Sequence, residues 1–445
     1  MTNVSNWIKK GLMLTAIIFL ISMLALVVYR YHLEAPQWDQ WELVPLLEKY
    51  YGRNLKFSDL WFQHNEHRLL LPKAVMLGLA SLTRWNIFVE QIFNLFLSVI
   101  IFILFVIKVK RNFKTYYGKG LDFFILVLAL LIFSLNQGES WFWSWNMQIF
   151  FNLLAVIAGI FFLSARNLGL WHLGMAVFCG LAANYSYAVG LIYWPAGLMV
   201  IAFMAGEDRK KKIVYLFLWM LIATLAITVF FINYARPEDQ AILSLVLKWP
   251  WRYLQYVLAY LGAPLLPAEA NPQASFLLGL SGLLLMTALS FFLLKKSRVN
   301  FRELLPFFVL SLYAIGSALL TGIGRAGYGP IQAMSSRYIT LSNMFWAYIF
   351  LCLFLFLITQ KKNILIYVII ISASLLLLRS SFNSVLFFKE RYEWLRPAER
   401  ELFLMENDDL LKRLYPNLGL LDKDELKKRV DFLREKKLAL FRQVP

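Results

Sequence analysis

The sequence predicts an all-α polytopic membrane protein with about eleven transmembrane helices, each about 20 mostly apolar residues long. Of its 445 residues, 60% are hydrophobic and 16% are charged, and the mean hydropathy is +0.60. Soluble globular chains hold about 45–50% apolar and about 25% charged residues. The apolar runs recur along the whole chain. This pattern excludes a soluble enzyme, a disordered chain and a small disulfide scaffold.

The first apolar run, 11–29, follows Lys9 and Lys10 and continues into Val27-Val28-Tyr29 without a small-residue cleavage site. We interpret it as a retained membrane anchor and not as a signal peptide. The other predicted spans lie at 87–107, 121–136, 147–165, 171–187, 188–205, 213–234, 276–294, 304–320, 339–359 and 363–380.

The apolar stretch 69–83 is short and holds Pro72 and Lys73, so we expect a helix that lies in the membrane interface. The distribution of positive charge supports this choice. With a cytoplasmic N-terminus, every short basic cluster then falls on the cytoplasmic side, as membrane proteins prefer. If 69–83 crossed the bilayer, the cluster in 108–119 would move outside. Topology therefore explains the net charge of +18 better than a nucleic-acid partner does.

The predicted domain organisation follows from these spans. Residues 1–380 form the transmembrane domain, with long outer loops at 30–86 and 235–275. Residues 381–445 form a small helical C-terminal domain, which we expect to be extracytoplasmic. Leu426, Val430, Leu433 and Leu440 share one face of the predicted tail helix. The two cysteines, Cys179 and Cys352, lie in apolar runs, so they predict neither a disulfide framework nor a metal-binding cluster.

The predicted spans hold few ionisable side chains, and this argues against a proton pump or an ion-coupled transporter, which usually carry such groups near mid-membrane. Polar side chains gather instead on the predicted outer face. A site at this boundary suits a substrate that is part lipid and part sugar or phosphate.

The first outer loop is the richest in polar groups. It contains Trp38-Asp39-Gln40-Trp41-Glu42 and, later, His64-Asn65-Glu66-His67-Arg68. Asp39 could act as a general base beside aromatic rings that stack on a sugar. The alternative is that the tryptophans anchor the chain in the interface and that Asp39 caps a helix.

This layout resembles the GT-C superfamily of membrane glycosyltransferases, which use polyprenyl-phosphate sugars. The segments 38–41 and 64–68, followed by a helix from Leu69, occupy the places of that family's first-loop catalytic acid and juxtamembrane helices. The resemblance covers the layout of roughly residues 1–380 and implies an inverting transfer with Asp39 as general base. Here Gln40 follows Asp39 in place of a second acid. Glu42 or Glu66 could take that role.

Two further outer segments could border the same cavity. The segment 136–148 places three tryptophans around Glu139 and ends at Gln148. It predicts a sugar platform or, alternatively, an aromatic girdle. The polar hairpin 184–190 could face the same cavity, or it could be a plain turn.

The last outer segment, 322–330, contains four glycines and Arg325, and Arg337 follows shortly afterwards. Glycines allow close approach to a ligand, and arginine offers a planar fork for phosphate oxygens. We expect Arg325 and Arg337 to hold the donor's lipid phosphate, which is also the leaving group. The alternative is that they bind lipid head groups or an acid of the tail. The site model requires Asp39, Glu139, Arg325 and Arg337 to lie within about 15 Å, the reach of one sugar-phosphate head group.

The sequence thus predicts catalytic roles for Asp39, Glu42 and Glu66. The candidate substrate-binding residues are Trp38, His64, His67, Arg68, Glu139, Trp145, Gln148, Arg325, Arg337 and Tyr338.

The predicted partners are a polyprenyl-phosphate-linked sugar donor, membrane lipids and a glycan, lipid or protein acceptor, with no nucleic acid. We expect no cofactor and no metal, and a bacterial inner membrane with the site facing the periplasm or exterior. Two other functions stay open. One is an O-antigen polymerase or ligase, or another transferase of the outer face. The other is a non-enzymatic flippase or transporter of lipid-linked sugars.

Overall fold

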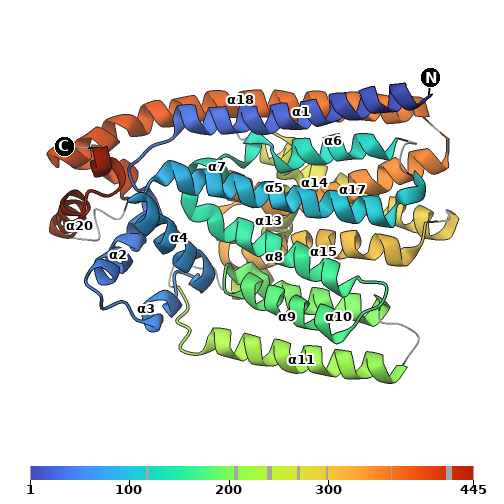
Figure 1. The fold of residues 1–445 in the computed structure, drawn as a ribbon, viewed down its shortest axis with the longest axis horizontal. Coiled ribbons are helices and arrows are strands. Elements are labelled where there is room, and N and C mark those ends of the chain that lie inside the picture. The colour runs from blue at the N-terminus through green and yellow to red at the C-terminus, as the bar shows by residue number, and fades with distance from the viewer. Residues whose placement is uncertain are drawn as a thin grey trace.

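The computed structural model describes residues 2–116, 120–204, 209–237, 243–267, 271–296, 299–361, 363–416 and 423–443. Figure 1 shows long helices side by side, with shorter helices gathered at one end. Over the described ranges there is no β-strand, and the sole β-bridge joins His64 and His67. The all-helical class is therefore confirmed.

Eight stretches of the described chain are long and apolar enough to cross a membrane, so the multi-pass prediction is confirmed. They correspond to all or most of α1 (Thr2–Tyr31), α5 (Ile87–Asn112), α6 (Leu121–Ile132), α8 (Met147–Leu163), α11 (Arg209–Phe231), α14 (Pro272–Lys296), α15 (Phe301–Arg325) and α17 (Ser336–Thr359).

The other predicted spans have a different form. The runs 171–187 and 188–205 correspond to α9 (Leu170–Asn184), η5 (Ala188–Ile192) and α10 (Tyr193–Met204). With 15 residues, α9 is about 22 Å long, which is short of a hydrocarbon core of about 30 Å. Residues 363–380 open the 42-residue helix α18 (Asn363–Leu404), which is not among the eight. The count of eleven stays a prediction.

The predicted first outer loop, residues 30–86, holds four helical segments joined by irregular stretches. It contains η1 (Trp38–Leu43), α2 (Val44–Tyr51), α3 (Phe57–Trp61) and α4 (Leu70–Thr83), and the last covers the helix expected at 69–83. In Figure 1 these helices lie beyond the end of the long-helix bundle. Lys73 is buried within the apolar α4, and its Nζ donates to the carbonyl of Phe62 at 2.9 Å. This bond offsets part of the cost of burying the ammonium group.

The segment 235–275 is not an open loop. It contains α12 (Leu243–Lys248), α13 (Pro250–Gly262) and η6 (Ala263–Leu265). The backbones of α13 and α14 touch, because a Cβ on Gly262 would lie 1.9 Å from the carbonyl oxygen of Ser275. A Cβ on Gly279 would likewise lie 2.0 Å from the carbonyl oxygen of Leu258. Because these glycines have no side chain, α13 can pack closely against α14, and part of the expected loop belongs to the bundle.

The C-terminal part returns along the molecule. Figure 1 shows α18 beside α1, and the helix continues past residue 380 to Leu404. It leads to α19 (Asp408–Leu414), α20 (Lys423–Glu435) and η8 (Ala439–Gln443). Leu426, Val430 and Leu433 are buried on one face of α20. Leu440 is in η8, so the prediction that it shares the face of this helix was wrong. The helix α20 ends before Leu440, and Lys437 between them takes a left-handed conformation.

Short helical turns complete the connections. They are η2 (Lys114–Tyr116), η3 (Leu135–Gln137), α7 (Gly138–Phe142), η4 (Ser144–Asn146), η7 (Ala326–Tyr328) and α16 (Pro330–Ala333).

Candidate functional site

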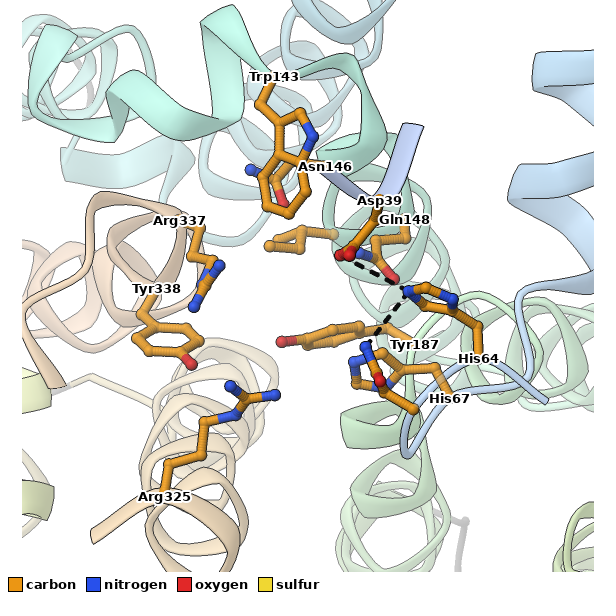
Figure 2. Close-up of a pocket in the computed structure, with 12 residues that line it drawn as sticks. Asp39, His64, His67, Trp143, Asn146, Gln148, Tyr187, Arg325, Arg337 and Tyr338 are labelled. Atoms are coloured by element: carbon orange, nitrogen blue, oxygen red, sulfur yellow. Dashed lines mark hydrogen bonds and ion pairs between the residues drawn. The ribbon is translucent and has the colours of Figure 1, made fainter. Parts of the chain in front are cut away.

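A polar cavity lies where the first outer loop meets α8, α15 and α17. In Figure 2, Asp39 and His64 are on one side of it, and Arg325, Arg337 and Tyr338 are on the other. The cavity is lined by Asp39, His64, Asn65, His67, Trp143, Asn146, Gln148, Ile149, Tyr187, Arg325, Arg337 and Tyr338.

Asp39 is presented by the short helix η1. The turn begins at Trp38, whose φ of 51° is unusual for a bulky residue. The buried Gln40 anchors η1 by donating from Nε2 to Oγ of Ser144 at 2.5 Å, and Ser144 in turn donates to Glu90 at 2.5 Å. Gln40, the residue after Asp39, therefore anchors η1 and is linked through Ser144 to the carboxyl group of Glu90. An ionised second acid here could not donate to Ser144 as the amide does, and its burial would cost free energy.

His64 is an ionisable neighbour of Asp39. Its Nε2 lies 3.5 Å from Oδ2 of Asp39 and 3.3 Å from Nδ2 of Asn65. A tight hairpin places it there, because the amides and carbonyls of His64 and His67 exchange hydrogen bonds of 2.9 and 2.8 Å. The ring of His64 packs edge-on against Trp145, with 5.2 Å between centroids. The imidazole can thus orient the Asp39 carboxylate or receive its proton.

Glu66 and Arg325 form an ion pair at the edge of the cavity, with Nη2 3.1 Å from Oε1. Burial alone would raise the pKa of Glu66, but the neighbouring His67 and Arg325 together lower that pKa to about 2. Burial lowers the pKa of His67 to about 4, so this ring is neutral at pH 7. Its Nδ1 accepts the amide proton of Ala188 at 3.2 Å. Glu66 is therefore a charged partner of Arg325 and not a spare acid.

Arg337 is held by Glu139, which is not itself among the residues that line the cavity. Nη1 of Arg337 lies 3.9 Å from Oε1 of Glu139. The other carboxylate oxygen accepts from the backbone amide of Arg337 at 3.2 Å and from Oγ of Ser336 at 3.1 Å. Glu139 thus caps the start of α17 and supports the arginine, where the sequence predicted contact with a sugar.

Two tyrosine hydroxyls complete the cationic side of the cavity. Tyr338 accepts a hydrogen bond of 2.9 Å from Nε2 of Gln332 and stacks on Tyr260. Tyr187 is buried, and its hydroxyl can donate to a ligand. Figure 2 shows this hydroxyl pointing toward the side that holds Tyr338 and the arginines.

Several predicted site residues are not brought to the cavity. Arg68 donates to the carbonyls of Phe230, Trp61 and Ile232, so it anchors the first outer loop to the end of α11. Glu42 faces the C-terminal part of the chain, and its Oε1 lies 3.6 Å from Nη1 of Arg429. Six predicted residues are absent from the lining of this cavity in the described structure: Trp38, Glu42, Glu66, Arg68, Glu139 and Trp145.

Sequence reasoning missed other lining residues as site candidates: Asn65, Trp143, Asn146, Ile149 and Tyr187. All but Ile149 belong to the polar segments singled out above. The sequence therefore indicated which segments border the cavity, and it did not indicate these individual side chains. Gln148, a predicted site residue, lines the cavity, and its buried Oε1 has no hydrogen-bond partner among the described residues. A buried acceptor of this kind calls for a donor from a ligand or from water.

A second, larger and more apolar cavity shares His67, Tyr187 and Arg325 with the polar one. Its remaining lining residues are Glu66, Ala188, Val189, Leu191, Phe230, Phe231, Tyr234, Arg236, Leu320, Thr321, Ile323 and Gly324. The two cavities together offer a polar chamber beside a larger space whose apolar lining suits a hydrocarbon chain.

The described residues contain no cluster of three or more histidine, cysteine, aspartate or glutamate side chains that could hold a metal ion. The prediction of metal independence stays open to a chelator assay. Comparisons of the chain with protein-family models, with curated proteins and with solved structures found no match.

Proposed function

We propose that this protein is a membrane glycosyltransferase that moves a sugar from a polyprenyl-phosphate donor to a hydroxyl of an envelope glycan, lipid or protein. The observation that carries the proposal is one shared cavity. Asp39 lines it together with Arg325 and Arg337, which follow almost 300 residues later. A general base and a phosphate grip are the two elements that such a transfer needs.

In the proposed reaction, the Asp39 carboxylate accepts the proton of the acceptor hydroxyl. The acceptor oxygen attacks the anomeric carbon, and the bond from that carbon to the phosphate oxygen breaks. The phosphate leaves with the bonding electrons as a polyprenyl phosphate, and the sugar inverts its configuration. Asp39 and the arginines stand on opposite sides of the cavity, which suits an in-line displacement between them.

The two arginines suit the leaving group. Each is partly shielded from water, with 28% of the side chain of Arg325 and 24% of that of Arg337 exposed. Ion pairs with Glu66 and Glu139 orient their planar forks, which hydrogen-bond phosphate oxygens in pairs. Charge that develops on the phosphate would be stabilised by donors that are already in place.

The adjoining apolar cavity supports a lipid-linked donor. Phe230, Phe231 and Leu320 line it, and Arg325 belongs to both cavities. A polyprenyl chain in the apolar cavity would place its phosphate at this shared wall. In this proposal the protein is in a bacterial inner membrane, the cavities face the periplasm or exterior, and all eleven predicted spans cross the bilayer.

The test is transfer by the purified protein in proteoliposomes, supplied with a radiolabelled sugar on polyprenyl phosphate and an envelope extract as acceptor. We expect a labelled product from the unmodified protein and a loss of about 10² to 10⁴-fold with Asp39→Asn. Asp59→Asn is the matched control, because Asp59 is in the same outer loop and pairs with Lys49.

Labelled sugar that only crosses the bilayer, with no covalent product, would contradict the proposal and identify a carrier. Full transfer by Asp39→Asn together with loss in the arginine variants would contradict the role of Asp39. That result would favour a polymerase or ligase type of reaction.

A further inference from the structure

The stretch of residues 34–42, which we name the Asp39 turn, has little regular structure to hold it in place. Residues 32–37 are in neither a helix nor a strand, and η1 adds only six residues of 3-10 helix. Such short helices are marginal on their own. A base at this position must nevertheless stay within a fraction of an ångström of its substrate.

One side of the Asp39 turn rests on the membrane bundle. Nε1 of Trp143 donates to the carbonyl of Gln37 at 3.1 Å, and Gln40 donates to Ser144. These contacts fix the inner side of the turn and leave its outer side to other partners.

The outer side is held by the C-terminal part of the chain, residues 391–443. Nη2 of Arg391 donates to Oε1 of Gln37 at 3.0 Å, and its guanidinium carbon lies 4.9 Å from the centre of the Trp38 ring. Gln37 is 3% exposed, so this is a buried contact two residues before Asp39. Arg391 therefore grips the beginning of η1 through both a hydrogen bond and a cation–π contact.

Arg429 holds the other end of the same helix. Its Nη1 donates to the carbonyl of Trp41 at 3.0 Å and lies 3.6 Å from Oε1 of Glu42. Arg429 is itself fixed by Glu425 at 2.6 Å, and only 8% of it is exposed. The two arginines thus bracket Asp39, one on each side along the chain.

Residues 391–443 also contact Glu34 and Ala35, at the beginning of the Asp39 turn. Oε1 of Glu399 accepts from the backbone amides of Glu34 and Ala35 at 2.7 and 3.0 Å. Nη2 of Arg442 donates to Oε1 of Glu34 at 2.7 Å. Every one of these contacts joins residues more than 350 positions apart in the chain.

We propose that residues 391–443 are the element that positions the Asp39 turn, with Arg391 and Arg429 as positioning residues for the general base. Neither arginine is among the residues that line the polar cavity, so they act through the turn and not on the substrate. The inference rests on the proposed function for its catalytic consequence, whereas the positioning itself can be measured without any transfer.

The structural experiment uses Asp39→Cys as a reporter in the full-length protein. The native Cys179 and Cys352 are buried, so the new thiol is the one that a membrane-impermeant maleimide reaches. Adding Arg391→Ala or Arg429→Ala should raise the labelling rate several-fold, because the turn then opens more often. The matched control is Arg434→Ala, since Arg434 contacts Asp431 and Phe403 within the tail. Its labelling rate should equal that of the parent.

The catalytic experiment uses the same arginine variants with Asp39 intact, in proteoliposomes. We expect kcat to fall roughly 10- to 100-fold while KM for the donor changes less than about twofold, because the site of donor binding is untouched. Arg391→Lys keeps the cation over Trp38 and should recover part of kcat. It also serves if Arg391→Ala does not fold.

Unchanged labelling in both alanine variants would overturn the proposal, whatever the activity. A kcat loss that Arg434→Ala shares equally would overturn it as well, because it would indicate a general weakening of the tail. If Asp39→Asn leaves transfer intact, the proposed function fails, and a raised labelling rate would still support the positioning of the turn. The two failures are therefore distinguishable.

Discussion

Nε2 of His64 lies 3.5 Å from Oδ2 of Asp39, although α2 and α3 separate the two residues along the chain. The His64 side chain is 14% exposed and rests on Trp145, whereas that of Asp39 is 38% exposed and faces the polar cavity. One partner is thus fixed and the other open to a ligand. This arrangement suits a base whose orientation is set by a neighbouring ring.

The first prediction concerns this pair. His64→Gln should lower kcat about tenfold, less than Asp39→Asn, because the carboxylate remains but loses its orienting partner. The measurement is steady-state transfer in proteoliposomes. His172→Gln is the control, since His172 lies at the start of α9, where its Nδ1 accepts from the amide of Gly169. Equal rates for His64→Gln and the unmodified protein would remove His64 from the mechanism.

The second prediction concerns the phosphate grip. Arg337→Lys keeps a positive charge but loses the planar fork that Glu139 orients. We expect kcat/KM for the lipid-linked donor to fall about 10²-fold, the cost of about 2.7 kcal/mol of lost transition-state stabilisation. Arg53→Lys, at an exposed position of the first outer loop, should leave kcat/KM unchanged. A Lys variant with full activity would show that charge alone suffices.

The third prediction tests the apolar cavity. Leu320 lines it and Leu319 does not, although both side chains are exposed, at 36% and 40%. Leu320→Trp should fill part of the cavity and raise KM for a polyprenyl-linked donor, while KM for a short-chain analogue changes little. Leu319→Trp should leave both values unchanged. An identical KM in the two tryptophan variants would mean that the lipid chain binds elsewhere.

The fourth prediction concerns pH. Burial lowers the pKa of His67 from 6.5 to about 4. Between these two pH values, His67 is therefore protonated in the unfolded chain and neutral in the folded protein. Stability should therefore fall as the pH decreases from 6.5 toward 4, and this group should contribute no change above that range. His67→Gln removes this titration. Between pH 7 and pH 5, its Tm in detergent should fall less steeply than the Tm of the unmodified protein, and parallel slopes would contradict the assignment.

Hydropathy carried most of the fold prediction, because a membrane-spanning helix must be long and apolar whatever it packs against. The helix at 69–83 was also within reach of sequence analysis, since charge placement argued for it independently. Local patterns could not show that α13 enters the bundle. That packing depends on Gly262 and Gly279 meeting backbone from another helix, and a glycine in a sequence does not reveal its neighbour.

The candidate site was predictable as a set of segments and much less as a set of side chains. Asp39, Arg325 and Arg337 stood out by type and position, and the structure places them around one cavity. Glu42 and Glu139 also stood out as acids, yet their partners are Arg429 and Arg337. Which acids are paired depends on contacts between distant parts of the chain, such as the hydrogen bond between Trp41 and Arg429, which are 388 positions apart.

The central claim is that a base and a phosphate grip share one site, and a structure with bound polyprenyl phosphate tests it most directly. The account predicts phosphate density in contact with the guanidinium groups of both Arg325 and Arg337, with Asp39 across the same cavity and the lipid chain along Phe230 and Leu320. Phosphate density at a different part of the protein, away from Arg325 and Arg337, would contradict it.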